Sequence, residues 1–461
     1  MNGPPLRVGC AAGFSGDRTD AARPVVDALI AAGGPAFLIF ETLAERTLAL
    51  AQLARRVDPS LGYEPLLADL LRPVLARCLE HRIRIVSNFG AANPPGAARA
   101  ILALARTLGL PAPRVAVVAG DDLSTAAARP LLQTALRDAD ATEDVDALME
   151  RMVCANAYIG AEPIADALRA GADIVVAGRV ADPSLTVGPA LAHYGWAPDD
   201  WDRLARATMV GHLLECGAQV SGGYYADPGF KDVPDLAHVG YPIAEIDADG
   251  HCTITKPEGT GGRIDEHTLK EQLLYEVHDP SAYLTPDVVA DLGAATVRQL
   301  GPDRVRLEGV RGHARPDRLK VNVFSEQGWF AEGEISYAGP RAEARARLAA
   351  DILRERLRPL GRVRVDLIGV ASVLGDDAGG WLAEHPAGQA RDVRLRVAMI
   401  QADRTLAERL PREVTALYTC GPAGGGGVRT GLRQRLSTNS CFVPRVQVPT
   451  TFSFVTEDDP A

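Results

Sequence analysis

Charged and amide side chains follow directly after several short apolar runs in the first part of the chain. The candidates are Asp17 and Arg18 after residues 7–10, Asn88 after residues 83–86, Asp121 after residues 114–118, and Arg179 and Asp182 after residues 172–176. Carboxylates that share one crevice can acquire separated pKa values and divide the roles of general acid and general base. An arginine beside them can hold a substrate carboxylate through two hydrogen bonds. These residue types predict acid–base chemistry on an anionic substrate.

Two of these aspartates also have a purely structural interpretation. Asp121 and Asp182 stand where helix N-caps are expected, and Pro183 follows at a position that suits the first residue of a helix. One side chain can both cap a helix and take part in catalysis. From the sequence alone, both interpretations stay open.

A histidine, a glutamate and a cysteine end a long helical pattern over residues 199–216. On a helix His212 shares a face with Glu215 and Cys216. A Cys–His nucleophile is disfavoured, because the helix dipole opposes a thiolate at a C-terminus. A His-x-x-Glu pair alone supplies too few ligands, so no metal site is predicted. We interpret His212 and Glu215 as site residues with acid–base potential, against the alternative of a structural pair.

A glycine-rich segment, residues 254–265, reads ITKPEGTGGRID. An alternating run enters it and a helical pattern leaves it, so backbone N–H groups and a helix N-terminus can point at an anion. The predicted binding residues here are Lys256, Glu258, Gly259, Gly261, Gly262 and Arg263. The alternative is a tight turn that needs several residues with positive φ.

Several common catalytic motifs are absent from the chain. It has neither a GxSxG nucleophile elbow nor an HExxH helix, and its glycine loop is neither a Walker A loop nor GxGxxG. A nucleotide-dependent enzyme is therefore less favoured than one that needs only acid–base groups. The candidate residues favour a lyase, such as a hydratase, over a hydrolase or an oxidoreductase. No cofactor is evident.

Residues 6–195 alternate short apolar runs with amphipathic helical stretches. This pattern predicts βαβ units, and hence an α/β fold with a parallel, doubly wound, Rossmann-like or flavodoxin-like sheet and helices on both of its faces. Ligands bind outside the carboxyl ends of the strands in such sheets. The polar loops, including Glu41–Thr42 after residues 36–40, should therefore meet at one edge.

The pattern changes in the second part of the chain. Polar and apolar residues alternate over 251–255 and 320–324, which predicts half-exposed and partly antiparallel strands. Helices are expected over residues 265–277 and 340–357. Because the chain is too long for a single compact core, we expect two lobes, residues 1–205 and residues 206–461, the second with a mixed sheet.

Composition excludes several classes of protein. The chain has 49 basic and 59 acidic residues and a net charge of −10, which argues against nucleic acid as a partner. No apolar run approaches the ~20 residues that span a membrane, and the N-terminus does not resemble a signal peptide. The 7 cysteines are scattered without a CxxC pair. We expect a cytoplasmic protein without disulfides and without a membrane partner.

Five segments, in this order, resemble the acyclic terpene utilisation (AtuA) family: residues 9–18, 156–161, 178–182, 211–217 and 256–262. The resemblance extends over nearly the whole chain. It implies a role with branched terpenoid acids carried as acyl-CoA thioesters, or in secondary metabolism, with coenzyme A as part of the substrate. It implies no set of catalytic residues. Some members carry a small C-terminal domain that this chain lacks, so a separate small subunit is an expected partner, beside a homo-oligomer.

Together these features favour an enzyme that moves water or a proton next to the carbonyl of a carboxylate or acyl thioester. Its expected catalytic residues are Asp17, Asp182, His212 and Glu215. Its expected substrate-binding residues are Arg18, Asn88, Asp121, Arg179, Lys256, Glu258, Gly259, Gly261, Gly262 and Arg263. The alternative is a non-catalytic acyl- or CoA-binding subunit that needs a partner for turnover.

Overall fold

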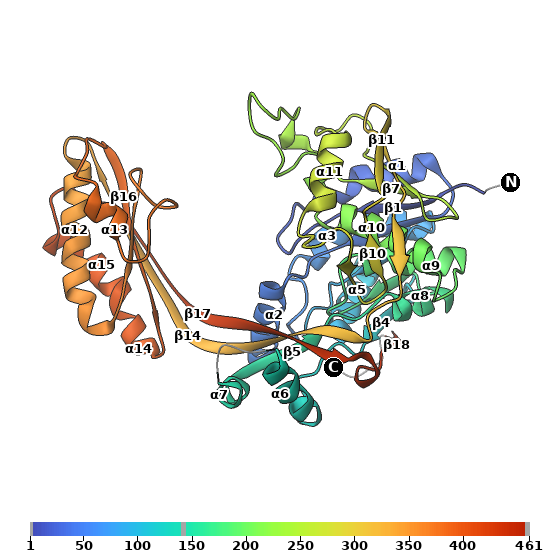
Figure 1. Ribbon diagram of the computed structural model, residues 1–461, viewed down its shortest axis with the longest axis horizontal. Coiled ribbons are helices and arrows are strands. Elements are labelled where there is room, and N and C mark those ends of the chain that lie inside the picture. Colours follow the sequence, from blue (N-terminus) through green and yellow to red (C-terminus); the bar gives the residue numbers. More distant parts are fainter. Residues whose placement is uncertain (1–2, 140–143, 457–461) are drawn as a thin grey trace. The chain divides into compact units, whose positions relative to one another are not determined.

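The computed structural model describes residues 3–139 and 144–456. The chain divides into two compact units, which Figure 1 shows with their elements labelled. Unit 1 comprises residues 1–323 and 438–461, and unit 2 comprises residues 324–437. This division differs from the boundary that the sequence pattern suggested at residues 205/206. Residues 206–323 belong to the same unit as residues 1–205, and unit 2 is an insertion.

Unit 1 is built on a mixed sheet of ten strands in the order β11-β12-β8-β7-β1-β2-β3-β6-β4-β18. Its central strands are β1 (Leu6–Cys10), β2 (Ala36–Phe40), β3 (Arg84–Ser87), β6 (Ile174–Val176) and β4 (Val115–Ala119). All neighbours among these five pair in parallel. The five parallel strands predicted from the sequence are confirmed, each within two residues of its expected range.

Antiparallel strands extend this parallel core at both edges. They are β7 (Ile243–Ile246), β8 (Cys252–Thr255), β12 (Arg304–Glu308) and β11 (Thr296–Gly301) beyond β1, and β18 (Thr451–Val455) beyond β4. The antiparallel pairing expected for residues 251–255 is confirmed. The expected half-exposure is wrong, because Thr253 is buried, as is Asn322 in the second alternating run. Residues 252–254 and 321–324 are buried on both faces.

Apolar cores lie on both faces of the sheet. Side chains of β2 alternate between them: Phe37 and Ile39 face one core, and Leu38 and Phe40 face the other. One core takes residues from α1 (Ala22–Ala32), α3 (Leu67–Leu71), α4 (Leu75–Glu80) and α5 (Pro94–Thr107). The other takes residues from α6 (Arg129–Asp138), α7 (Val145–Glu150), α8 (Glu162–Arg169), α9 (Ser184–Tyr194), α10 (Trp201–Glu215) and α11 (Glu266–Leu274). Burial on both faces explains why the strands are continuous apolar runs.

The remaining elements of unit 1 are short, apart from α2. They are α2 (Glu45–Val57), β5 (Met152–Ala157), and a separate antiparallel sheet of β9 (Tyr283–Leu284), β10 (Val289–Asp291) and β13 (Arg311–His313). The 3-10 turns of this unit lie at Ala126–Ala128, Gly217–Gln219, Leu236–His238 and Arg445–Gln447. The helices predicted over residues 199–216 and 265–277 are found as α10 and α11, with Asp200 and Asp265 as their N-caps.

Unit 2 has the strand order β15-β16-β14-β17 with helices packed on one face. Its elements are β14 (Arg318–Ala338), α12 (Ala342–Leu357), β15 (Arg364–Ile368), α13 (Gly380–Glu384), β16 (Asp392–Gln401), α14 (Arg404–Ala407), α15 (Arg409–Cys420) and β17 (Gly426–Pro444), with a 3-10 turn at Arg358–Leu360. Leaving aside the short α13 and α14, this is the βαββαβ succession of a ferredoxin-like domain. The long strands β14 and β17 belong partly to unit 1.

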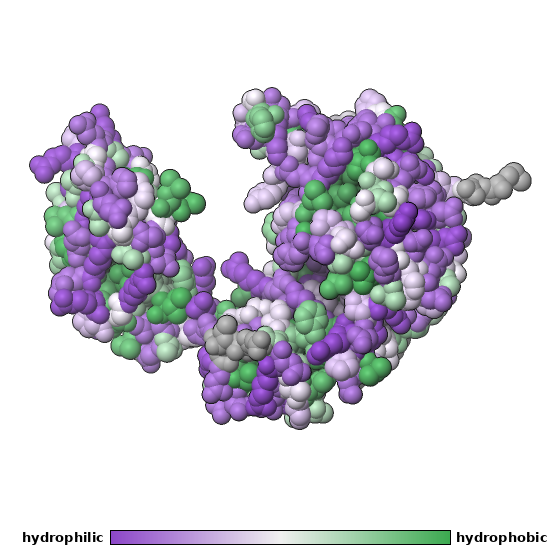
Figure 2. All heavy atoms as spheres, viewed as in Figure 1, coloured by the Kyte–Doolittle hydropathy of each residue, from purple (hydrophilic) through white to green (hydrophobic). Residues whose placement is uncertain are grey.

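The surface is predominantly hydrophilic on the side shown in Figure 2, with hydrophobic residues in small groups within both units. Among the described residues, no helix has the length and apolar character that a membrane span requires.

Candidate functional site

Unit 1 contains a cavity of about 380 Å³ into which carboxylates from several elements point. Its ionisable and phenolic lining residues are Glu45, Tyr158, Asp182, Glu215, Glu276, Tyr283, Arg318 and Lys320. Leu284, Leu319 and Phe442 contribute apolar wall. Of the sequence-predicted site residues, Asp182 and Glu215 line this cavity, and Arg179 and His212 contact them directly.

Arg179 follows β6 and is buried, with 1 % of its surface exposed. Its guanidinium donates to the backbone carbonyls of Leu43 and Val180 and to the Asp182 carboxylate, and it lies over the Tyr158 ring. Asp182 keeps 33 % of its side chain exposed toward the cavity. Burial raises the pKa of Asp182 although Arg179 opposes the shift. The guanidinium thus orients a carboxylate at the cavity wall.

The N-cap interpretation of Asp182 is wrong. Helix α9 begins at Ser184 with Pro183 as its N-cap, and no side chain caps it. The Asp182 carboxylate is directed at Arg179 instead.

Asp121, at the end of β4, also does not cap a helix. Its Oδ2 accepts the backbone N–H of Arg179 at 2.8 Å and the Asn156 amide at 3.0 Å. Gly178 permits this approach, because a Cβ there would lie 2.7 Å from Asp121 Oδ2. Burial raises the pKa of Asp121 to about 6. Asp121 therefore fixes the backbone on which Arg179 stands and does not line the cavity.

Asn88 connects the ends of β3 and β2. Its Nδ2 donates to Glu41 Oε1 at 2.8 Å, and its Oδ1 accepts the Thr42 N–H at 2.7 Å. Glu41 is buried, and burial together with the Asp182 charge raises its pKa well above the ordinary range. Asn88 is thus a scaffold residue. Glu41 was visible in the sequence as a strand-end residue, but nothing there marked its burial.

His212 and Glu215 are paired near the end of α10, with His212 Nδ1 3.0 Å from Glu215 Oε1. Both residues are buried, and neither His212 Nε2 nor Glu215 Oε2 has a hydrogen-bond partner among the described residues. Burial raises the pKa of Glu215 to about 7. Burial alone would lower the pKa of His212, but the Glu215 carboxylate outweighs it and the pKa is raised.

Cys216 caps the same helix and is not set up as a nucleophile. Burial and the Glu215 charge both raise the pKa of its thiol. The surroundings of Cys216 thus disfavour a thiolate, as the helix dipole at this end also does.

Tyr158 forms a second polar group at the cavity wall. Its hydroxyl donates to Glu45 and accepts from Asn322 Nδ2 at 3.0 Å. Lys320 Nζ lies 4.8 Å from the Tyr158 ring centroid and 3.6 Å from Glu45 Oε1. The Ser440 hydroxyl fixes the Asn322 amide at 2.7 Å. The partners of Tyr158 are distant in the sequence, so sequence patterns gave no sign of this group.

The glycine loop places its cations against carboxylates of the protein itself. Lys256 Nζ lies 3.2 Å from Asp303 Oδ2 and donates to the Thr260 carbonyl at 2.8 Å. Arg263 lies 2.7 Å from Asp265. None of the residues 256–263 lines the cavity described above.

Its glycines satisfy requirements of backbone packing. A Cβ at Gly261 would lie 1.9 Å from the Asp235 carbonyl oxygen, and one at Gly262 would lie 2.6 Å from that of Ser221. Gly259 and Gly262 also have positive φ, 76° and 82°. The exposed Glu258 completes the loop. The tight-turn interpretation accounts for these features.

Asp17 and Arg18 hold the loop after β1. Asp17 accepts the Gly13 N–H at 2.8 Å and the Tyr241 hydroxyl at 2.5 Å, and Arg18 forms a two-point ion pair with Asp20. Gly13 packs on the end of α10, where its Cβ would lie 2.4 Å from the Cys216 carbonyl carbon. This loop supports α10 and contributes no residue to the cavity wall.

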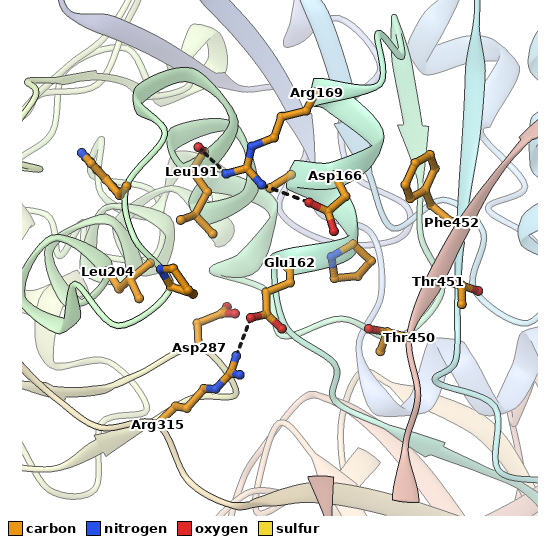
Figure 3. Close-up of a pocket in the computed structure, with 14 residues that line it drawn as sticks. Glu162, Asp166, Arg169, Leu191, Leu204, Asp287, Arg315, Thr450, Thr451 and Phe452 are labelled. Atoms are coloured by element: carbon orange, nitrogen blue, oxygen red, sulfur yellow. Dashed lines mark hydrogen bonds and ion pairs between the residues drawn. The ribbon is translucent and has the colours of Figure 1, made fainter. Parts of the chain in front are cut away.

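A larger cavity of about 660 Å³ lies elsewhere in unit 1 (Figure 3). Its charged groups pair with one another: Arg315 with Glu162 at 2.8 Å, and Arg169 with Asp166 at 3.0 Å. Asp287 accepts from Ser184 Oγ and the Ala161 N–H. Because its carboxylates are already paired or hydrogen-bonded, we select the smaller cavity as the candidate site.

Neither tyrosine of the site, nor Glu45, was selected from the sequence. Tyr283 belongs to a strand of two residues, which leaves no periodic pattern. Among the described residues no group of His, Cys, Asp and Glu has the arrangement to hold a metal ion.

No curated protein and no solved structure matches the chain. The model of the acyclic terpene utilisation family protein AtuA matches residues 6–454. This match confirms the resemblance seen in the sequence, and the chain belongs to the AtuA family.

Proposed function

We propose that the protein is an enzyme that moves a proton next to the carbonyl of an acyl thioester, as in a hydration or dehydration. The observation that carries this proposal is the His212–Glu215 pair. Glu215 lines the cavity, and its Oε2 is buried without a partner among the described residues; the imidazole paired with it also keeps a buried nitrogen, Nε2, without a partner there. Such groups are costly unless a ligand or water satisfies them.

Glu215 is the proposed general base and acid. Its carboxyl pKa, raised by burial to about 7, places both protonation states within reach at neutral pH. His212 does not line the cavity, and its role is to hold Glu215 through Nδ1 and to share its charge. Asp182, held by Arg179, is the second carboxyl group, available to a water molecule or to the leaving hydroxyl.

The charge of the cavity favours a neutral carbonyl compound over a free carboxylate. Its lining has four carboxylates, Glu45, Asp182, Glu215 and Glu276, but only two cations, Arg318 and Lys320. Lys320 is already paired with Glu45. A substrate carboxylate would add like charge to this group, whereas a thioester brings none. The cavity suits the acyl chain, and the carrier part of the thioester would lie outside it.

The family sets the metabolic context of the proposal. A role in acyclic terpene utilisation requires branched acyl chains, and the apolar wall of Leu284, Leu319 and Phe442 offers them a surface. Terpenoid catabolism or secondary metabolism of related acids would both supply such substrates.

Hydrogen exchange tests the proposal even before the full reaction is identified. Thioesters of branched acids and of their β-hydroxy and α,β-unsaturated derivatives would be incubated with the protein in D₂O, and deuterium uptake followed by mass spectrometry. We expect uptake at the carbon next to the carbonyl of at least one thioester and none in the free acids. Uptake with free acids only would contradict the neutral-carbonyl argument.

A blocked cavity assigns the exchange to this site. Leu284 lines the cavity and is 63 % exposed, so Leu284→Trp fills the entrance without disturbing a core. Leu274→Trp is the matched control, because Leu274 is 56 % exposed and lies outside the lining. Exchange should be lost in the first variant only. Tight binding of thioesters by calorimetry with no exchange would favour the binding subunit that needs a partner.

A further inference from the structure

Tyr283 differs from the other tyrosine of the cavity in what its hydroxyl contacts. Both residues line the cavity. The Tyr158 hydroxyl is engaged by Glu45 and Asn322. The Tyr283 hydroxyl has no hydrogen bond to any residue within 3–139 or 144–456. A phenol that adjoins a cavity without a protein partner is free to bind a ligand.

Its surroundings keep this hydroxyl in the neutral form. Burial and the nearby Glu215, Asp182 and Glu276 carboxylates all raise the pKa of Tyr283. The His212 ring lies 5.3 Å away, centroid to centroid, which places Tyr283 beside the His212–Glu215 pair. Tyr283 therefore offers a hydrogen-bond donor adjacent to the proposed base.

Backbone contacts hold Tyr283 at this place. It pairs with Ala290 in the small antiparallel sheet, and the following segment is anchored by Asp287, which accepts from Ser184 Oγ at 2.6 Å. Ser184 begins α9, two residues after Asp182. The donor and the carboxylate are thus fixed to one framework, as catalytic preorganisation requires.

We propose that Tyr283 is a catalytic residue that donates a hydrogen bond to the carbonyl oxygen of the bound thioester. This inference rests on the proposed function. Glu215 takes the proton from the adjacent carbon, the electron pair moves into the carbonyl, and the resulting oxyanion keeps the hydrogen bond from Tyr283. Return of the proton from Glu215 restores the thioester, so the exchange needs no further reactant.

Replacement by phenylalanine tests the role in exchange. For Tyr283→Phe we expect the exchange rate to fall about 100- to 1,000-fold, the usual effect of removing one oxyanion donor. Its melting temperature should be unchanged, because no protein hydrogen bond is lost. Tyr158→Phe is the matched control: it removes buried hydrogen bonds, so it should lower the melting temperature and affect exchange less. An exchange rate for Tyr283→Phe within twofold of the wild type overturns the inference and leaves the proposed function standing.

A binding experiment tests the same contact when exchange is absent. The probes are one branched acyl thioester and its thioether analogue, in which a CH₂ group replaces the carbonyl. Tyr283→Phe should weaken thioester binding about five- to tenfold and leave thioether binding unchanged, as for loss of one hydrogen bond. Equal effects on both probes, or no binding of either to the wild type, overturn the inference. If the wild type exchanges deuterium and Tyr283→Phe weakens the binding of both probes equally, the inference about Tyr283 is wrong and the proposed function still stands.

Discussion

The acidic cavity and the glycine loop of residues 254–265 both look like sites in the sequence, but they differ in how their polar groups are satisfied. In the loop, Lys256 and Arg263 pair with Asp303 and Asp265, and of these two cations only Arg263 keeps a buried nitrogen, Nε, without a partner among the described residues. In the cavity, His212 Nε2 and Glu215 Oε2 are buried without partners among the described residues. Both regions therefore contain a buried unpaired atom, but only at the cavity do such atoms belong to an acid–base pair whose carboxylate lines open space. Residue types alone do not separate the two regions.

The glycines of the two regions also differ in what they position. Glycines of the loop are needed by neighbouring protein backbone, as at Gly261 against Asp235. Gly178 serves Asp121, which in turn fixes the backbone of Arg179 beside the cavity. In both regions a glycine lets two segments of the protein lie close together. Only at Gly178 does this close packing position a side chain, Arg179, beside the cavity wall.

The largest expected difference between the regions is in activity. Glu215→Gln removes the proposed base, so we expect deuterium exchange into the thioester to fall by at least about 100-fold. Glu258→Gln makes the same change at an exposed glutamate of the glycine loop and should leave the rate unaltered. Similar losses of deuterium exchange in both variants, measured at equal protein concentration, would show that the cavity and the glycine loop do not differ in their contribution to activity.

A second difference concerns the two arginines and folding. Arg179→Met leaves the Leu43 and Val180 carbonyls and the Asp182 carboxylate without their donor. Breaking a buried pair of this kind should cost about 3–5 kcal/mol of unfolding free energy, measured in urea. Arg263→Met removes a partly exposed pair and should cost about 0–1 kcal/mol. Equal losses of unfolding free energy in the two variants would show that the buried Arg179 pair stabilises the protein no more than the partly exposed Arg263 pair.

A third test uses the pH dependence of stability at Asp121. Its pKa is about 6 in the folded protein against an ordinary value of 3.8. Between these values the folded state holds a proton that the unfolded state has lost, so stability rises as the pH falls from 7 toward 4. The effect is on the order of 2–3 kcal/mol. Asp121→Asn should remove this part of the pH dependence in thermal melts.

Its control is the neighbouring residue. Asp122 is exposed, and its charge raises the pKa of Asp121 less than burial does, so Asp122→Asn should reduce the pH dependence of the melting temperature much less than Asp121→Asn does. If Asp121→Asn also kept the wild-type dependence, the buried carboxyl would not be the group that titrates.

Apart from the control variants, the smallest expected effect is at Lys256. Lys256→Met removes an ion pair with the partly exposed Asp303 and should lower the unfolding free energy by about 1 kcal/mol, with exchange unchanged. Loss of exchange without loss of stability would instead support the glycine loop as an anion-binding site.

Much of the framework could be predicted from the sequence. The five parallel strands were predicted correctly because strands buried on both faces are short apolar runs ended by polar residues. Helix α10 was predicted from the helical pattern of residues 199–216, and the structure shows Asp200 as its N-cap. The pairing of His212 with Glu215 followed from helical spacing alone.

The rest depended on contacts between distant segments. Arg179 is held by the carbonyl of Leu43, and Tyr158 by Asn322, and no local pattern encodes either contact. Tyr283 lies in a two-residue strand. Strand β8 carried a local signal for antiparallel pairing, but none for its place between β7 and β12. Sequence reasoning therefore located one edge of the sheet and some of the side chains near it, Asp182 and Glu215, but neither tyrosine of the cavity.

The insertion of unit 2 has a consequence for the order of synthesis on the ribosome. Strand β18, which pairs with β4 and completes the ten-stranded sheet, follows residues 324–437 in the chain. Ser440 and Phe442, which support and line the cavity, follow them as well. Unit 2 is thus fully translated before unit 1 can close its sheet, and the cavity becomes complete only after residue 442 has been synthesised.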